Sequence, residues 1–301
     1  IFMCLRALQA IAACTFVVAR AIVRDTTETQ ASGSKIAYIS MGTAICPMFG
    51  PALGGLMDGW FGWEANFWFI GGLGLFILVI AYFDLGETVP ENTQGFRQQF
   101  SEYPELLLSR RFWGYCLASA FGAGAFFAYL GGGPFVGSIV YNLSPEMLGL
   151  YFGAPAIGYF FGNFLSGRFT IRFGIDAMIL WGLWIIFSGL SLSMVCSYIG
   201  YGTVETFFGF MIFVGLGNGL TIPNATAGML SVRPHLAGTA SGLGGAMMIA
   251  IGAALSTLAG AFLVPGSNEM PLLMLMWFSS LSGVAVIIYV RQRNKRLKKL
   301  F

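Results

Sequence analysis

The side chains with the clearest potential for chemistry are Arg6 and Gln9, which lie three positions apart in a long apolar segment. This spacing puts both on one face of a helix. A charged group inside a membrane is costly and usually functional. A guanidinium stays protonated, so Arg6 could not carry a proton, but it could favour the ionised form of a carboxyl group opposite. Two structural alternatives stay open: Arg6 extends to the outer lipid headgroups, and Gln9 bonds a neighbouring helix.

A second group of side chains could contact a solute. Asn218 lies within the glycine-rich run 215–219, which marks an interrupted, flexible helix of the kind that forms binding sites in membranes. Tyr115, Phe126 and Tyr129 are aromatic and suit lipophilic or cationic molecules. The alternatives are an asparagine that bonds another helix and aromatic rings that face lipid.

The chemistry of soluble enzymes is not indicated. The single histidine, His235, lies in a polar loop, and the five cysteines are scattered singly, so no metal-ligand spacing occurs. There is no Gly-Lys-Ser phosphate-binding loop. The sequence therefore predicts a protein that is not an enzyme and has neither metal nor cofactor. The net charge of +3 comes mostly from the C-terminal tail and favours a membrane surface over nucleic acid.

These side chains must be positioned by membrane-spanning helices. The chain is 56% hydrophobic and 10% charged, whereas soluble domains carry about 25% charged residues. A span needs about 20 mostly apolar residues, and in lipid its backbone must bond internally, so we predict an all-α polytopic membrane protein. Nine spans are predicted, at residues 2–23, 35–57, 65–84, 112–135, 146–167, 176–197, 205–224, 237–263 and 271–290.

The charges alternate between the gaps that separate these spans. All but one of the 16 Lys and Arg residues fall in alternate gaps or in the tail, and the intervening gaps hold acids but no basic residue. Because basic loops stay on the cytoplasmic face, we predict a multi-pass protein of the cell (inner or plasma) membrane. It divides into three helices of an N-terminal bundle (1–84), a cytoplasmic linker (85–111), a six-helix C-terminal bundle (112–290) and a basic cytoplasmic tail (291–301).

Small residues recur four positions apart in two of the predicted spans. Residues four apart share a helix face, along which two backbones can approach closely. The rows suggest an internal repeat of three spans, although mixtures of Gly and Leu occur in all membrane helices. The first row is Gly149 and Gly153, then Gly158, Gly162 and Ser166; the second is Gly238, Gly242, Ala246, Ala250 and Ala254.

Two motifs on adjacent spans resemble a known family. In residues 46–55, Gly50 and Gly54 share a face with Gly55 beside them, and Pro51 removes an N–H and bends the helix. This run resembles the fifth-helix motif of drug/proton antiporters of the major facilitator superfamily, with a cysteine in place of the first glycine. Residues 5–10 are similar to the fourth-helix motif of the superfamily, with alanine where glycine is usual.

The resemblance has consequences for the fold and for the site. Residues 142–145 and 162–174 look like the bicyclomycin and chloramphenicol resistance branch. The chain would be helices four to twelve of a twelve-helix protein, truncated at its N-terminus. The resemblance implies that Arg6 faces a central cavity and couples protons to substrate. All 13 acidic residues fall in loops or at span ends, so the proton-carrying acid is expected in the missing segment.

By this resemblance the chain is identified with a proton-coupled exporter of drug-like molecules that works by alternating access. The rivals are a metabolite transporter on the same scaffold, and a non-transporting membrane sensor or gene remnant. The expected partners are a small drug-like solute, protons and the lipid bilayer, with no nucleic acid, and a monomer is expected.

Overall fold

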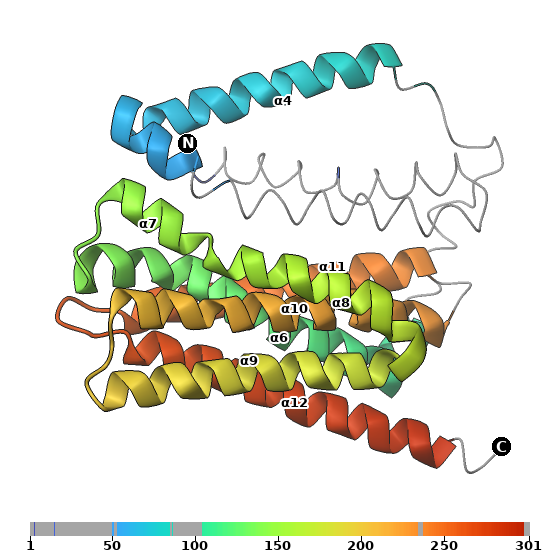
Figure 1. Ribbon diagram of the computed structural model, residues 1–301. Coiled ribbons are helices and arrows are strands. Elements are labelled where there is room, and N and C mark those ends of the chain that lie inside the picture. Colours follow the sequence, from blue (N-terminus) through green and yellow to red (C-terminus); the bar gives the residue numbers. More distant parts are fainter. Residues whose placement is uncertain are drawn as a thin grey trace.

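The protein is described by a computed structural model, and the described residues are helical with no strand among them (Figure 1). This confirms the predicted all-α class. The described residues are Met3, Thr15, Gly50, 53–84, Gly86, 104–233 and 237–297. The helices are α4 (Glu64–Asp84), α6 (Arg110–Phe135), α7 (Pro145–Phe152), α8 (Ala154–Phe173), α9 (Ile175–Tyr198), α10 (Val204–Val232), α11 (Ala237–Phe262) and α12 (Met270–Leu297), with a π-helical segment η2 (Val136–Val140) that continues α6.

Of the seven predicted spans from 65–84 onward, six coincide with single helices. Six described segments are long and apolar enough to cross a membrane by length and composition. The predicted spans 2–23 and most of 35–57 lie outside the described residues, so the count of nine stays a prediction.

The predicted span 146–167 differs from the structure because it is broken in two. Gly153 caps the end of α7, and Pro155 lies in the first turn of α8. Proline is tolerated in the first turn of a helix, but in a helix interior it removes a hydrogen bond and its ring meets a preceding carbonyl group. Two helices that meet at Gly153 avoid this conflict.

Three helices run beyond the predicted ends. Helix α10 continues through Pro223 to Val232, α12 continues to Leu297, and α6 passes through Pro134 into η2. The predicted ends mark where the apolar run stops. The hydrogen bonds of a helix backbone do not depend on lipid, so a helix can continue past the membrane surface without unwinding. The basic tail predicted from residue 291 therefore begins as the last part of α12.

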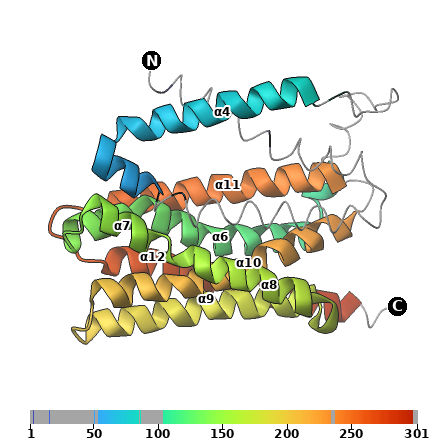
Figure 2. The same ribbon diagram turned by 45° about the horizontal axis from the view of Figure 1, so that its top comes forward.

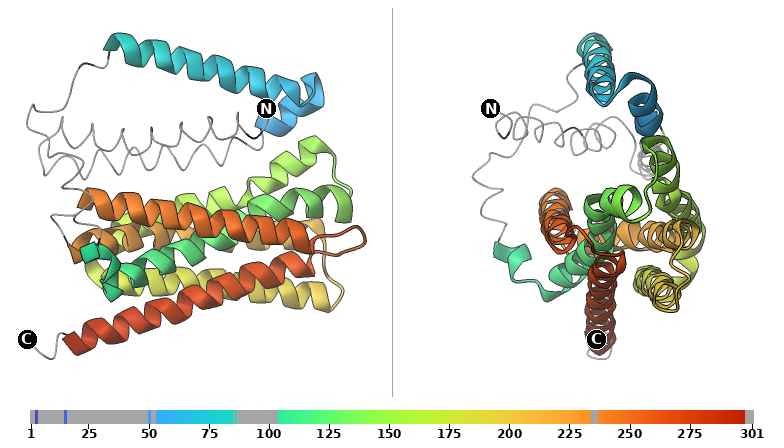
Figure 3. Two further views of the ribbon diagram at one scale, coloured as in Figure 1. Left: turned by 180° about the vertical axis from the view of Figure 1, so that it is seen from behind. Right: turned by 90° about the vertical axis from the view of Figure 1, so that its left-hand side faces the viewer.

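Helices α6 and α10 form the centre of the bundle. Helix α10 packs most extensively on α8 and α9, α6 packs on α11 and α12, and the two central helices pack on each other. The end-on view in Figure 3 shows this arrangement. Helices α8 and α9 follow each other in sequence but touch little, because each is held by α10.

The contact between α8 and α10 is made by backbone against backbone. A Cβ atom on Gly158 would overlap the carbonyl oxygen of Ile212, and one on Gly162 would overlap the carbonyl oxygen of Leu216. From α10, a Cβ on Gly219 would lie 2.7 Å from the backbone nitrogen of Asn163. The first predicted row of small residues is thus a helix-packing surface at Gly158 and Gly162, as expected for membrane helices.

Helix α4 and the helical residues 53–61 lie at one side of the molecule. Figures 1 and 2 show α4 apart from the bundle of α6 to α12, and none of its residues is buried among the described ones. The helical residues 53–61 reach the bundle at α7. A Cβ on Gly55 would lie 2.7 Å from the carbonyl oxygen of Pro145 and 3.2 Å from Cα of Gly149. This contact joins the two predicted bundles.

Candidate functional site

The candidate site lies at the middle of α10, where Asn218 has 14 helical residues before it (218 − 204) and 14 after it (232 − 218). At about 1.5 Å per residue it is roughly 21 Å from either end of the helix. Its side chain is only 3% exposed. Gly217 and Gly219 flank it, and such small residues let neighbouring helices approach closely. A polar amide is thereby enclosed at mid-depth of the bundle.

Two polar atoms at this depth are buried without a hydrogen-bond partner among the described residues, Oδ1 of Asn218 and Oγ1 of Thr221. The first faces α6, where a Cβ on Gly122 would lie 3.1 Å from it. The second faces Gly182 of α9. A buried polar group left unpaired costs about 1–3 kcal/mol, and a bilayer supplies no water to relieve it. A polar group of a solute that bonded to one of these atoms between the helices would recover this free energy.

Asn224, six residues further along α10, is fully bonded. Its Nδ2 donates to the Ser166 hydroxyl at 2.8 Å and to the Leu220 carbonyl oxygen at 2.7 Å, and its Oδ1 accepts from the Thr170 hydroxyl at 2.9 Å. The bonds with Ser166 and Thr170 join α10 to α8. Asn224 therefore has a structural role between helices, which distinguishes it from Asn218.

The predicted aromatic residues of α6 pack within the bundle. Tyr129 is fully buried, stacks on Phe152 with ring centroids 4.6 Å apart, and donates its hydroxyl hydrogen to the Phe152 carbonyl oxygen at 3.1 Å. Phe126 is half-buried, and its ring lies 6.3 Å from that of Tyr129. Tyr129 is inaccessible in this conformation. Contact with a solute, which stays a prediction, would require these helices to separate.

Tyr115 belongs to a polar cluster at the predicted cytoplasmic end of the bundle. Its hydroxyl donates to Oδ1 of Asp176 at 2.7 Å, and Nδ2 of Asn294 donates to that hydroxyl at 3.0 Å and to Oδ2 of Asp176 at 2.9 Å. The cluster joins α6, α9 and α12. Asn294 was not predicted as a site residue because it lies in the predicted tail. A polar residue one turn after Val290, where the predicted apolar span ends, was the available signal.

A second ionisable pair lies at the opposite end of the bundle. Glu269, just before α12, is only 7% exposed, and Tyr141 follows η2. Burial, reinforced by the negative charge of Glu269, raises the pKa of the Tyr141 hydroxyl above its usual value. The hydroxyl oxygen has no hydrogen-bond partner among the described residues. The pair is thus electrostatically coupled but not bonded.

The remaining predicted residues belong to the first two spans. Arg6, Gln9 and Pro51 lie outside the described residues. Among the described residues, a Cβ on Gly50 would meet no atom within 4 Å, and one on Gly54 would lie 3.5 Å from Oδ1 of Asn66, whose Nδ2 donates to the Gly54 carbonyl oxygen at 3.2 Å. Among the described residues of the motif, the close helix contact is made by Gly55.

Comparisons with known proteins agree on one family. The sequence profile described as Major Facilitator Superfamily matches residues 1–257. A bicyclomycin resistance protein homolog of Haemophilus influenzae is 27% identical over 289 residues, which are 92% of this chain and 70% of that protein. The chloramphenicol resistance protein of Pseudomonas aeruginosa is 31% identical over 265 residues, which are 84% of this chain and 61% of that protein.

A further relative and a solved structure extend the comparison. Multidrug resistance protein D of Escherichia coli is 26% identical over 280 residues, which are 90% of this chain and 67% of that protein. The crystal structure of a bacterial homolog of the human lysosomal transporter Spinster, in an inward-facing and occupied conformation, has a TM-score of 0.56 and 19% identity. The match covers 90% of this chain and 70% of that chain, and it supports the fold.

Proposed function

Because the chain belongs to the major facilitator superfamily, as the two sequence motifs predicted, we propose that it acts in proton-coupled export of drug-like molecules. It is a multi-pass protein of the cell membrane. The observation that carries the proposal is the similarity over most of the chain to proteins named for resistance to bicyclomycin, chloramphenicol and multiple drugs.

The proposed mechanism is alternating access between two bundles, residues 1–84 and 112–290, joined by the linker 85–111. Each bundle would move as a unit around a site at mid-depth, and Asn218 is the residue of that site that we expect to contact substrate. Its unpaired Oδ1 supports this role, because a polar substrate group would pair it. The contact of Gly55 with α7 would have to break when the site opens toward that end.

Arg6 is proposed to couple protons to substrate. It would stabilise the ionised form of a membrane-embedded carboxyl group, so substrate and proton would compete for one site. Moving one charge across 100 mV supplies about 2.3 kcal/mol, which is enough to shift such a competition by more than tenfold. Gln9, one turn from Arg6, would contact the same solute, and Tyr115, Phe126 and Tyr129 would contribute once the helices separate.

Drug-induced proton release tests both parts of this proposal. The complete reading frame that encodes this chain is expressed in cells without their own export pumps, and growth is measured in chloramphenicol, bicyclomycin and a panel of cationic dyes. We expect raised tolerance to at least one compound, and proton release on its addition to reconstituted vesicles. Arg6→Ala should abolish release while the protein still folds, and Arg6→Lys should restore only part of it, because an ammonium lacks the planar fork.

The alternatives give different results in the same assays. A metabolite transporter would release protons with a metabolite and leave drug tolerance unchanged. A protein that does not transport would do neither. Wild-type proton release in Arg6→Ala would mean that Arg6 only anchors its helix at the lipid headgroups.

A further inference from the structure

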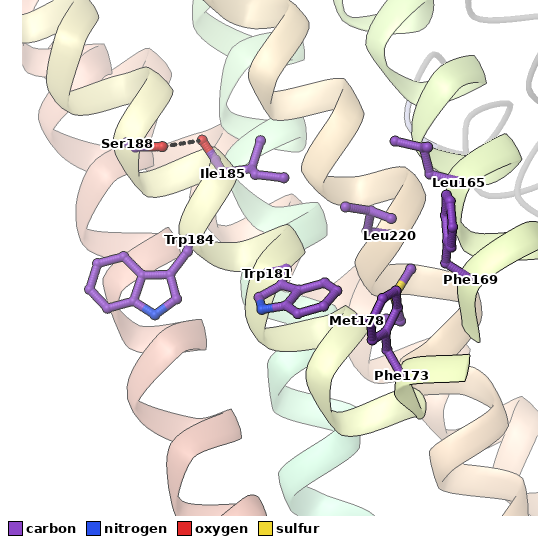
Figure 4. Close-up of a pocket in the computed structure, with 9 residues that line it drawn as sticks. All are labelled: Leu165, Phe169, Phe173, Met178, Trp181, Trp184, Ile185, Ser188 and Leu220. Atoms are coloured by element: carbon purple, nitrogen blue, oxygen red, sulfur yellow. Dashed lines mark hydrogen bonds between the residues drawn. The ribbon is translucent and has the colours of Figure 1, made fainter. Parts of the chain in front are cut away.

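An apolar groove runs along the outer face of the bundle between α8 and α9. Figure 4 shows its walls, with Leu165 and Phe169 on α8, Trp181 and Trp184 on α9, and Leu220 of α10 between them. Its volume is about 660 Å³, which is within the range of ligand pockets, about 300–1,000 Å³. The groove exists because α8 and α9 each pack closely on α10 and therefore stay apart from each other.

The groove surface is suited to a hydrocarbon chain. The one polar side chain in its lining, Ser188, already donates its hydroxyl hydrogen to the Ile185 carbonyl oxygen at 3.1 Å. Trp181 and Trp184 are 44% and 45% exposed, so their rings face outward. Tryptophan is enriched where a membrane protein meets the lipid headgroups.

Two arginines lie on α8 beside the groove, and Arg172 lies at the end formed by Phe173. Arg168 and Arg172 follow Leu165 by three and seven positions, which puts them on the α8 face that also carries Phe169 and Phe173. The guanidinium carbon of Arg172 lies 5.3 Å from the centre of the Phe173 ring. That ring in turn packs edge-on against Trp181, with centroids 5.0 Å apart. The cation and the apolar wall thus form one continuous surface.

Both arginines are exposed, and within the part of the chain that the structure describes neither forms an ion pair. The nearest acid along the chain is Asp176, but Tyr115 and Asn294 engage it against α6 and α12. The alternation of charges along the sequence puts this end of α8 on the cytoplasmic side. There the membrane surface carries anionic lipid, which attracts arginine at about 1 kcal/mol per residue.

We propose that this groove binds an anionic phospholipid of the cytoplasmic leaflet, with its phosphate held by Arg168 and Arg172 and one acyl chain lying over Leu220. A guanidinium pairs with phosphate through two parallel hydrogen bonds. Because a zwitterionic headgroup carries a cation beside its phosphate, the charge of two arginines favours an anionic headgroup. The site lies on the lipid-facing side of the bundle, away from Asn218, and the proposal holds whatever solute the protein transports.

Tryptophan quenching by brominated lipid tests this directly. The complete protein is reconstituted in phosphatidylcholine vesicles with increasing fractions of phosphatidylglycerol whose acyl chains carry bromine. The groove signal is the part of the quenching that is lost in Trp181→Phe/Trp184→Phe. We expect half-maximal groove quenching at a several-fold lower fraction of brominated phosphatidylglycerol than of brominated phosphatidylcholine.

The arginine variants distinguish a built site from ordinary boundary lipid. Arg172→Gln should raise the required fraction of phosphatidylglycerol roughly fivefold, as expected for the loss of one surface arginine, and Arg172→Lys should raise it less. The matched control is Arg233→Gln, which removes a cytoplasmic arginine that pairs with Glu105 outside the groove, and it should change nothing. Equal quenching by the two lipids, or an unchanged response in Arg172→Gln, would overturn the proposal. A cationic drug and excess unbrominated phosphatidylglycerol are each added to compete with the brominated lipid. If the drug alone removes the groove quenching, the groove is assigned to a solute instead.

Discussion

A single methyl group on Gly158 should force α8 and α10 apart. The Cβ of Gly158→Ala would overlap the carbonyl oxygen of Ile212 and lie 2.6 Å from the backbone nitrogen of Leu216, whereas real Cβ atoms stay beyond 3.0 Å. Both obstacles are backbone atoms, so no side-chain rotation relieves the overlap. The helices must separate by at least 0.4 Å (3.0 − 2.6) at Leu216, and by more at Ile212.

The cost of this separation follows from packing. A gap of 0.5–1 Å forfeits about a quarter to a half of each dispersion contact across it, and overpacking of a core costs about 1–3 kcal/mol. Alanine would recover at most about 1 kcal/mol through its better helix propensity. We therefore expect a net loss of about 1–2 kcal/mol of stability, which corresponds to roughly 2–8 °C in the unfolding temperature of a protein of this size.

Gly167→Ala is the matched control on the same helix. A Cβ on Gly167 meets no atom within 4 Å among the described residues, so only the gain in helix propensity, up to about 1 kcal/mol, should be seen. Thermal unfolding of the two purified variants, followed by tryptophan fluorescence in one detergent, compares them. Equal unfolding temperatures for Gly158→Ala and Gly167→Ala would refute the close contact of α8 with α10.

Three further predictions concern polar residues and topology. Asn224→Ala should lower stability by about 1–2 kcal/mol, because it breaks bonds from α10 to α8. Asn218→Ala should lower stability little, since the Asn218 oxygen is already unpaired. Thermal unfolding compares the two variants. Burial, with the Glu269 charge, raises the pKa of Tyr141, so the unfolded state ionises first and stability falls as the pH rises above about 10. Tyr141→Phe should reduce that fall, and a pH series of unfolding temperatures measures it. Gly95→Cys, as the only cysteine, should react with an impermeant reagent only after the membrane is opened, and labelling from outside would contradict the predicted topology.

The helices were predictable because a bilayer imposes a simple rule. Any segment of about 20 apolar residues must satisfy its own backbone, so composition alone located the six long apolar helices of the described part. The rule does not say where a helix ends outside the lipid, and α10 and α12 therefore run further than predicted. The break at Gly153 depends on the local chemistry of Pro155, which an average over 20 residues conceals.

The polar positions were only partly predictable. The glycine-rich run around Asn218 indicated a special position, and the structure adds that its oxygen is unpaired. The partners of Tyr115 lie 61 and 179 positions away in the sequence. No local pattern encodes such a meeting, because it depends on how α6, α9 and α12 are placed around one another. Spacing identifies a helix face, but the fold decides what that face meets.

The two rows of small residues illustrate this limit. In α8, Gly158 and Gly162 are covered by the backbone of α10. In α11, the equally spaced Gly242, Ala246 and Ala250 are exposed, with no described helix over them. The sequence pattern is the same, yet one row holds the bundle together and the other presents a smooth surface. A smooth surface lets another helix approach closely without interlocking side chains. We therefore expect that a helix could slide along the α11 face, whereas the α8 face is fixed against α10. Alanine at Gly242 should accordingly be neutral in the unfolding assay that penalises alanine at Gly158, and a comparable loss at both positions would show that a helix also covers α11.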